Sequence, residues 1–195
     1  TRNNLRFVVE AGQKLARIIG DILDYSEIEM DKLVVNTEDY MLSSLLNDIV
    51  ADVSCYMRKN IELVIDVEPD IPSVMNTDVG KLKKVLEHLI INALKFTPKG
   101  GIYVHINAEK RDYGINLCIE VTDTGIGMSV SELEEICKHF YQADSGRTRN
   151  TGGLGLGLSI VNGFIRSLNG FLIIDSEPEK GTTVRVSIPQ KVVDY

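Results

Sequence analysis

Two stretches, IYVHINA at residues 102–108 and INLCIEV at residues 115–121, decide the fold of this chain. In each of them every second residue is an aliphatic residue or alanine, which is typical of a strand with one buried face. Residues 110–114 lie between the two stretches and predict a turn, so together they form a hairpin. A sheet built in this way has one apolar face, and we expect helices to cover that face.

The segments on both sides of this hairpin predict further strands and helices. Asp78 is a suitable N-cap for a helix that continues to Phe96, because Pro98 and two glycines then stop it. Ser129 and Glu132 form a capping-box pair before another helix. The remaining periodic segments predict strands within 32–40, at 61–67, 171–175 and 182–188, and helices at 41–58 and 157–168. The chain is therefore expected to be an α+β two-layer sandwich, with a mixed, mostly antiparallel sheet and helices on one face.

Residues 1 to about 30 predict one long helix that precedes this sandwich. Its broad apolar stripe includes Leu5, Leu15, Ile19 and Ile22 and requires partner helices in a bundle, or else a place on the core of its own domain. We rank the bundle first, because the rest of the chain has enough apolar segments for its own core. This divides the chain at 1–32 and 33–195, and the helical pattern at Thr1 indicates a fragment of a longer protein.

The composition narrows the functional classes. A formal net charge of −7 counts against a general nucleic-acid binder, which needs a basic surface. No apolar run approaches the roughly 20 residues of a membrane helix, although the parent protein need not lack an anchor. Three scattered cysteines without a CxxC pair favour reduced thiols in a cytoplasmic protein.

Three polar or glycine-rich clusters contain the candidate site residues. His88, Asn92 and Lys95 are spaced four and three apart, so they line up on one helix, although an asparagine bonded to backbone and a solvated lysine fit as well. The second cluster, DTGIG at residues 123–127, follows a strand and equally fits a plain turn. The third, GGLGLG at residues 152–157, leads into a helix, where backbone amides bind phosphate well.

The sequences of these clusters, and the order in which they occur, resemble those of the ATP-binding catalytic domain of sensor histidine kinases. NALKFT at residues 92–97 resembles the N box, DTGIGM at 123–128 the G1 box, FYQAD at 140–144 the F box, and GGLGLGLSI at 152–160 the G2 box. Gly181-Thr182-Thr183 is similar to the closing turn of the family. ILDYSEIE at 22–29 resembles the end of the second helix of the dimerisation and phosphotransfer hairpin, which separates sensor kinases from gyrase-like and heat-shock ATPases.

The resemblance implies a role for each matching residue in binding ATP and Mg²⁺. Asn92 would hold Mg²⁺, Lys95 would neutralise phosphate, and Asp123 would read the adenine amine. The other residues that the resemblance assigns to the ATP site are Gly125, Gly127, Arg147, Arg149, Gly153, Leu154, Gly155 and Gly157. The reaction implied is transfer of the γ-phosphoryl group of ATP to a histidine, in a parent homodimer that then phosphorylates the receiver domain of a response regulator.

The chain also departs from the family pattern. His88 stands where the family usually has an asparagine, and we expect it to lie near phosphate. The phosphoacceptor histidine is missing, because the three histidines of the chain all fall within the ATP-binding unit, so the chain alone is expected to bind ATP without phosphorylating itself. Two alternatives remain: a degenerate nucleotide-binding regulatory module, and an ATPase of the gyrase and heat-shock type in which His88 activates water.

Overall fold

The computed structural model describes residues 2–141 and 156–195 of the chain. The helices are α1 (Arg2–Glu29), α2 (Leu42–Val53), α3 (Val79–Phe96), α4 (Val130–Tyr141) and α5 (Leu156–Ser167), with a 3-10 turn at Ser54–Tyr56. The strands are β1 (Glu38–Tyr40), β2 (Ile61–Val67), β3 (Val74–Thr77), β4 (Gly100–Arg111), β5 (Gly114–Asp123), β6 (Phe171–Glu177) and β7 (Gly181–Asp194). Within these ranges, no helix is both long and apolar enough to cross a membrane.

The strands form one sheet in the order β1-β3-β7-β5-β4-β2, and β6 also pairs with β7. All pairs are antiparallel except β2 with β4, which run parallel. The long strand β7 holds the sheet together, because β5 lies along one of its edges while β6 and then β3 pair with the other. The expected mixed, mostly antiparallel sheet is confirmed.

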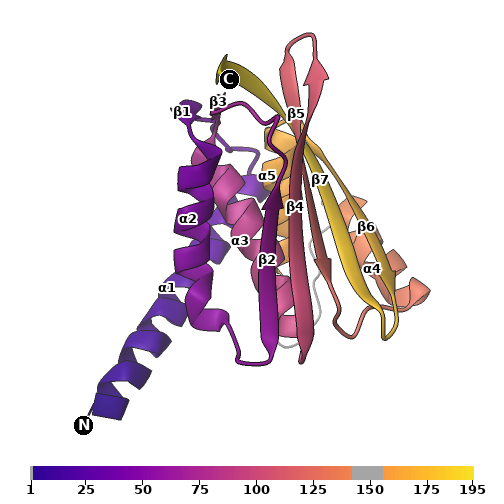
Figure 1. Cartoon of the computed structure of the whole chain (residues 1–195). Helices are drawn as coiled ribbons and strands as arrows, with labels where there is room; N and C mark the ends of the chain where they lie inside the picture. Colours follow the sequence, from indigo (N-terminus) through magenta and orange to yellow (C-terminus); the bar gives the residue numbers. More distant parts are fainter. Residues whose placement is uncertain (1, 142–155) are drawn as a thin grey trace.

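Helices α2, α3 and α5 lie on one side of this sheet (Figure 1). Helix α3 is the centre of the core, and Leu82, Leu86 and Ile90 on it are fully buried. They pack against the inward residues of the central strands, such as Ile106 and Leu117, which are also fully buried. Covering the apolar face of the sheet in this way supplies the hydrophobic stabilisation that the alternating strands predict.

Two parts of the sheet differ from the sequence-based expectation. Strand β3 lies in a segment that Pro69 and Pro72 made look like a loop, and β7 runs six residues past the expected end at residue 188. The two differences have one cause, since β3 pairs with the extension of β7, where Asn76 lies opposite Lys191. A strand held by pairing between distant segments leaves little local pattern.

The expected helix starts are confirmed. The Asp78 carboxylate caps α3, and its Oδ1 accepts a hydrogen bond from the Lys81 backbone N–H at 3.0 Å. At α4, the Ser129 backbone N–H donates to Glu132 Oε2 at 2.8 Å and the Glu132 N–H donates to Ser129 Oγ at 3.4 Å, which completes the predicted capping box.

Candidate functional site

Helix α3 carries the first group of candidate residues on the side that faces α5. His88 is buried, with 6% of its surface exposed, and Asn92 is half-buried one turn further along. A Cβ atom added at Gly157 would lie 3.4 Å from His88 Nδ1 and 3.9 Å from Asn92 Nδ2. The structure therefore brings His88, Asn92 and Gly157 together at the N-terminal end of α5, where unpaired backbone N–H groups favour an anion.

The second group lies where the C-terminal end of α3 meets the loop after β5. The Ile126 backbone N–H donates to the Phe96 carbonyl oxygen at 3.1 Å, which holds this loop against the helix end. Asp123 is the last residue of β5, and its Oδ1 accepts a hydrogen bond from the Gly125 backbone N–H at 2.8 Å. From His88 to Phe96 the helix rises by about 12 Å. The two groups are thus separated by about two turns of α3.

The carboxyl group of Asp123 is held in a largely dry environment, with 8% of the residue exposed. Burial raises the pKa of Asp123, and this effect exceeds the opposing effect of hydrogen bonds from the backbones of Gly125 and Thr182 and of the nearby Thr97 hydroxyl. A buried acceptor of this kind is suited to a fixed donor on a ligand, because a buried polar group without a partner is costly.

Two residues near Asp123 were not predicted as site residues from the sequence. Thr97 is fully buried, and its Oγ1 is near the Asp123 carboxyl but has no hydrogen-bond partner within normal distance among the described residues. Thr182 faces Asp123 across the β5–β7 pair. In the sequence, Thr97 follows a predicted helix and gives no further sign of a role in the site. The sequence also does not show the strand register that places Thr182 here, although Gly181-Thr182-Thr183 is similar to the closing turn of the family.

Glycine is required at two positions in the loop after β5, for a different steric reason at each. A Cβ at Gly125 would collide with the Phe96 carbonyl oxygen and lie 2.7 Å from Asp123 Oδ1, so only glycine lets the loop approach α3. Gly127 has a φ of +62° and its added Cβ would collide with the Glu177 carbonyl oxygen. Contacts within the protein therefore require glycine at both positions.

The other candidates are Lys95, near the end of α3, and residues that lie outside the described part of the chain. Lys95 lies on the exposed side of α3, with its Nζ 4.9 Å from the centre of the Phe96 ring. The remaining predicted ATP-site residues, which are Arg147, Arg149, Gly153, Leu154 and Gly155, lie outside the described residues.

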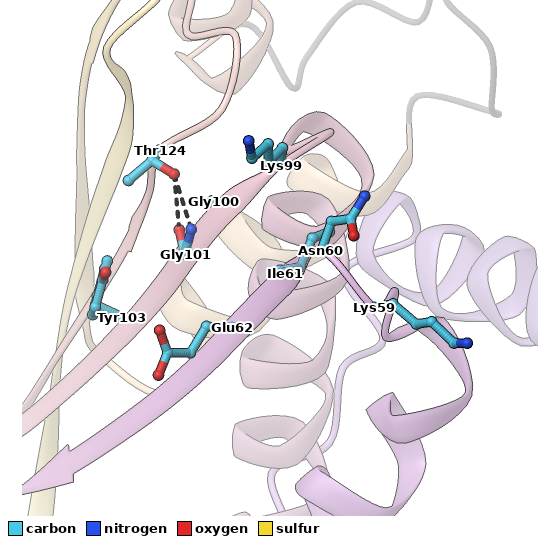
Figure 2. A pocket seen from close by; sticks show the side chains of 9 residues that line it. All are labelled: Lys59, Asn60, Ile61, Glu62, Lys99, Gly100, Gly101, Tyr103 and Thr124. Carbon is cyan, nitrogen blue, oxygen red and sulfur yellow. Dashed lines mark hydrogen bonds between the residues drawn. The ribbon is translucent and has the colours of Figure 1, made fainter.

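A separate hollow of about 550 Å³ lies at the start of β2 and β4 (Figure 2). Thr124 borders it, and the Gly101 N–H donates to Thr124 Oγ1 at 3.0 Å. Lys59 and Lys99 also line it, but none of the predicted ATP-site residues does. The predicted ATP-site residues therefore do not form this hollow.

Comparison with known families agrees with this arrangement. Residues 77–192, which include α3, the loop after β5 and α5, match the family described as histidine kinase-, DNA gyrase B-, and HSP90-like ATPases. The chain belongs to this ATPase family. Membership in a family of ATPases supports ATP as the nucleotide.

Within this family, the relatives of the chain are sensor histidine kinases. The chain is 37% identical over 182 residues to the sensor histidine kinase RcsC of Escherichia coli (strain K12), covering 93% of this chain and 19% of RcsC. It is 38% identical over 182 residues to the autoinducer 2 sensor kinase/phosphatase LuxQ of Vibrio vulnificus (strain CMCP6), covering 92% of this chain and 21% of LuxQ. The chain thus spans about a fifth of the length of these relatives.

A solved structure supports the fold over the whole chain. The crystal structure of full-length ShkA in complex with AMPPNP superposes with a TM-score of 0.77 at 24% identity, covering 100% of this chain and 40% of ShkA. The likeness includes α1, so the long first helix followed by the two-layer sandwich is an arrangement that a larger protein shares. The expected fold class is confirmed.

Proposed function

We propose that this chain is the ATP-binding catalytic part of a sensor histidine kinase and transfers the γ-phosphoryl group of ATP to a histidine imidazole. In that step the bond between the γ-phosphorus and its bridging oxygen breaks, a nitrogen–phosphorus bond forms, and ADP leaves. The observation that carries the proposal is the pair of groups along α3. A buried carboxylate stands beside the C-terminal end of α3, and an amide and an imidazole in the second half of the helix face the start of α5.

We assign the adenine to the Asp123 end of α3. The carboxylate accepts a hydrogen bond from an exocyclic amine, which adenine has and guanine lacks at the corresponding position. The unpartnered Thr97 hydroxyl beside it supports this assignment, since a buried hydroxyl without a partner among the described residues suits a water or a ring nitrogen. The exposed Phe96 ring supplies an apolar surface at the same end.

We assign the triphosphate and Mg²⁺ to the group formed by His88, Asn92 and Gly157. The described residues contain no group of three or more histidine, cysteine or carboxylate side chains that would hold a metal alone. This fits Mg²⁺, which is usually bound by one or two protein groups together with phosphate oxygens and water. Asn92 would supply the protein oxygen, while Lys95, Arg147 and Arg149 neutralise phosphate charge. Gly153, Leu154, Gly155 and Gly157 would line the triphosphate with backbone N–H groups.

The partners follow from the same proposal. Residues 1–32 belong to a dimerisation and phosphotransfer hairpin, and residues 33–195 form the catalytic domain. The parent is a homodimer in which the hairpin of the same or the partner subunit receives the phosphoryl group and passes it to a response-regulator receiver domain. Cys55 and Cys118 are free thiols, which suits the cytoplasm, where ATP is also available.

The test is nucleotide titration combined with phosphorylation in trans. Calorimetry with Mg·ATP is expected to show binding that Asn92→Ala weakens, and a separately supplied hairpin with a histidine is expected to gain acid-labile phosphate. The chain alone is expected to gain none, because it lacks the phosphoacceptor histidine and its three histidines all fall within the ATP-binding unit. Of these, His88 is buried and His105 is bonded to Asp66 at 2.9 Å on the opposite face of the sheet. Binding without transfer to any hairpin would instead favour a regulatory nucleotide-binding module.

A second candidate function rests on the surroundings of His88. Its Nε2 lies 3.4 Å from Asp21 Oδ1, and a carboxylate in this position orients a general base. An ATPase in which His88 activates water would use the same pair. Steady release of phosphate by the chain alone, lost in His88→Asn, would support this candidate, whereas phosphate transfer to a hairpin without steady release would exclude it.

A further inference from the structure

Helix α1 has two opposite faces with different chemistry. Arg17, Asp21, Asp24 and Ile28 follow one another at spacings of four, three and four, so they share one face of the helix. That face lies on α3 and α5. The apolar residues Leu15, Ile19, Ile22 and Leu23 occupy the other face and are 47–60% exposed. The contact with the catalytic domain is therefore made by the more polar face of α1.

Two contacts fix this polar face near its C-terminal end. The Asp24 carboxylate accepts hydrogen bonds from Lys84 Nζ on α3 at 2.7 and 2.6 Å. Ile28 packs on α5 directly over Gly163, where an added Cβ would lie 2.6–2.8 Å from three atoms of the Ile28 side chain. Glycine at position 163 is thus what allows α1 to lie this close to α5.

The third contact places His88 between α1 and the start of α5. Its Nε2 faces Asp21 Oδ1 at 3.4 Å, whereas its Nδ1 faces Gly157. The two side chains are largely shielded, with 8% of the His88 and 23% of the Asp21 side chain exposed. One imidazole ring therefore contacts the docked helix with one nitrogen and the start of α5 with the other.

We propose that His88 couples nucleotide binding to the docking of α1, so that the triphosphate and Asp21 compete for its single N–H. This inference rests on the proposed function, because it takes the phosphates to lie at the start of α5. A neutral imidazole has one donor nitrogen and one acceptor nitrogen. When Nε2–H points at Asp21, the bare Nδ1 faces the phosphates and repels their oxygens. When Nδ1–H donates to phosphate, the bare Nε2 faces the Asp21 carboxylate and α1 loses this contact.

Competition of this kind must be reciprocal. If docked α1 weakens nucleotide binding by some factor, the nucleotide weakens docking by the same factor. The Asp21 carboxylate adds to the effect, because it places a negative charge on the far side of His88 from the phosphates. The docked helix is thus an inhibitory element, and bound nucleotide promotes its release.

The experiment compares Asp21→Ala with Glu27→Ala in the full 195-residue chain. Glu27 is an exposed carboxylate on the same helix, so the control removes the same charge without touching His88. Affinity for Mg²⁺ with the ATP analogue AMPPNP is measured by calorimetry at pH 8, and amide hydrogen exchange of residues 15–28 is followed with and without the analogue. Asp21→Ala is expected to bind at least about 5-fold more tightly, the lower range of typical couplings, whereas Glu27→Ala should match the unaltered chain.

Hydrogen exchange reports the reciprocal effect. In the unaltered chain and in Glu27→Ala, AMPPNP is expected to speed exchange in residues 15–28. In Asp21→Ala, exchange there is expected to be fast already and to change little on binding. His88→Asn is expected to remove the effect of nucleotide on α1 exchange, whatever it does to affinity, because the asparagine side chain has no second nitrogen to face Asp21.

Gly163→Ala separates coupling from a local charge effect. It loosens α1 by displacing Ile28 and touches neither Asp21 nor His88, so tighter AMPPNP binding in this variant is expected only if docking itself opposes nucleotide. Unchanged affinity in both Gly163→Ala and Asp21→Ala, with α1 exchange indifferent to nucleotide, would overturn the inference and leave the proposed function standing. Failure of the unaltered chain to bind Mg²⁺ and AMPPNP would overturn both.

Discussion

Replacing Asp123 by asparagine should change ligand binding and stability in opposite directions. The asparagine side chain retains one oxygen that accepts the hydrogen bond from the Gly125 N–H, which is 2.8 Å from Asp123 Oδ1. It replaces the other oxygen by an NH₂ group, so a donor now faces the adenine amine, which is also a donor. The size and shape of the side chain hardly change, and the loop beside Phe96 is expected to stay in place.

The expected loss is that of one hydrogen bond to a charged acceptor. Such a bond contributes about 1.5–3 kcal/mol, so binding of ATP should weaken by roughly 10- to 150-fold. Discrimination against GTP should fall further, because the new NH₂ group can donate to the guanine carbonyl oxygen.

The effect on stability should have the opposite sign. Burial raises the pKa of Asp123 above its ordinary value of 3.8, so the ionised carboxylate is less favourable in the folded than in the unfolded chain. The folded state therefore loses stability as the pH rises from the unfolded pKa through the folded pKa. The Asp123→Asn variant has no such loss, so it should be at least as stable as the unaltered chain at pH 7. This advantage should shrink as the pH falls toward about 4 and be absent below that.

Calorimetry with Mg·ATP and Mg·GTP, together with thermal unfolding at pH 7 and pH 4, tests both parts. Unchanged ATP affinity in a folded variant would refute the assignment of the base to Asp123. A Tm that is lower at pH 7 but not at pH 4 would refute the argument that the ionised carboxylate is costly to bury, because the loss of the hydrogen bond from the Thr182 backbone would lower Tm at both pH values. ATP affinity and thermal stability are measured separately, so each result can be judged on its own.

Three further substitutions test the fold and the loop. Leu86→Ala empties a fully buried position on α3 and should cost about 2–5 kcal/mol, lowering Tm by roughly 4–20 °C; a smaller loss would contradict the placement of α3 at the centre of the core. Gly127→Ala forces a left-handed φ of +62° and a collision with the Glu177 carbonyl oxygen, so it should reduce ATP affinity as well as the free energy of unfolding, which denaturant titration measures; normal binding would show that the loop is not held in this shape for the ligand. Asp78→Ala removes the α3 cap and should cost about 1 kcal/mol at pH 7. Burial favours a higher pKa for Asp78, but its bonds from Lys81 and from the Asn36 backbone hold the pKa below 3.8. The difference in the free energy of unfolding between the two chains should therefore persist above pH 4 and disappear as the pH falls further. A difference that persists in acid would contradict this cause.

The parts of the fold that the sequence predicts are those with signals close together in the chain. Helix α3 is an example, since Asp78 caps its start and Pro98 and Gly100 follow its end. The β4–β5 hairpin is another, because alternation and a short turn lie within about twenty residues. In both cases a residue's neighbours in sequence are also its neighbours in space.

The parts that the sequence does not predict depend on distant pairing. Strand β3 exists because the end of β7 lies beside it, more than a hundred residues later. Pro189 lies within β7, and a proline is usually evidence against a central strand because it has no N–H to donate. The surroundings of Asp123 show the same limit, because Thr182 reaches it only through the register of β5 with β7.

The sequence predicts helix α1 from its local apolar periodicity, but it does not predict which helices α1 contacts. Its periodicity predicts a helix with an apolar face, and that face is exposed here, while the polar face meets α3 and α5. The Asp24–Lys84 pair is weak by nature, since Lys84 is 46% exposed and partly solvated pairs contribute about 0–1 kcal/mol. A helix held by a few weak polar contacts and by the partly buried Tyr25 and Ile28 is released by smaller changes in free energy than a helix that buries a whole apolar stripe. The polarity of the docked face is therefore what makes α1 suitable as an element that nucleotide can displace.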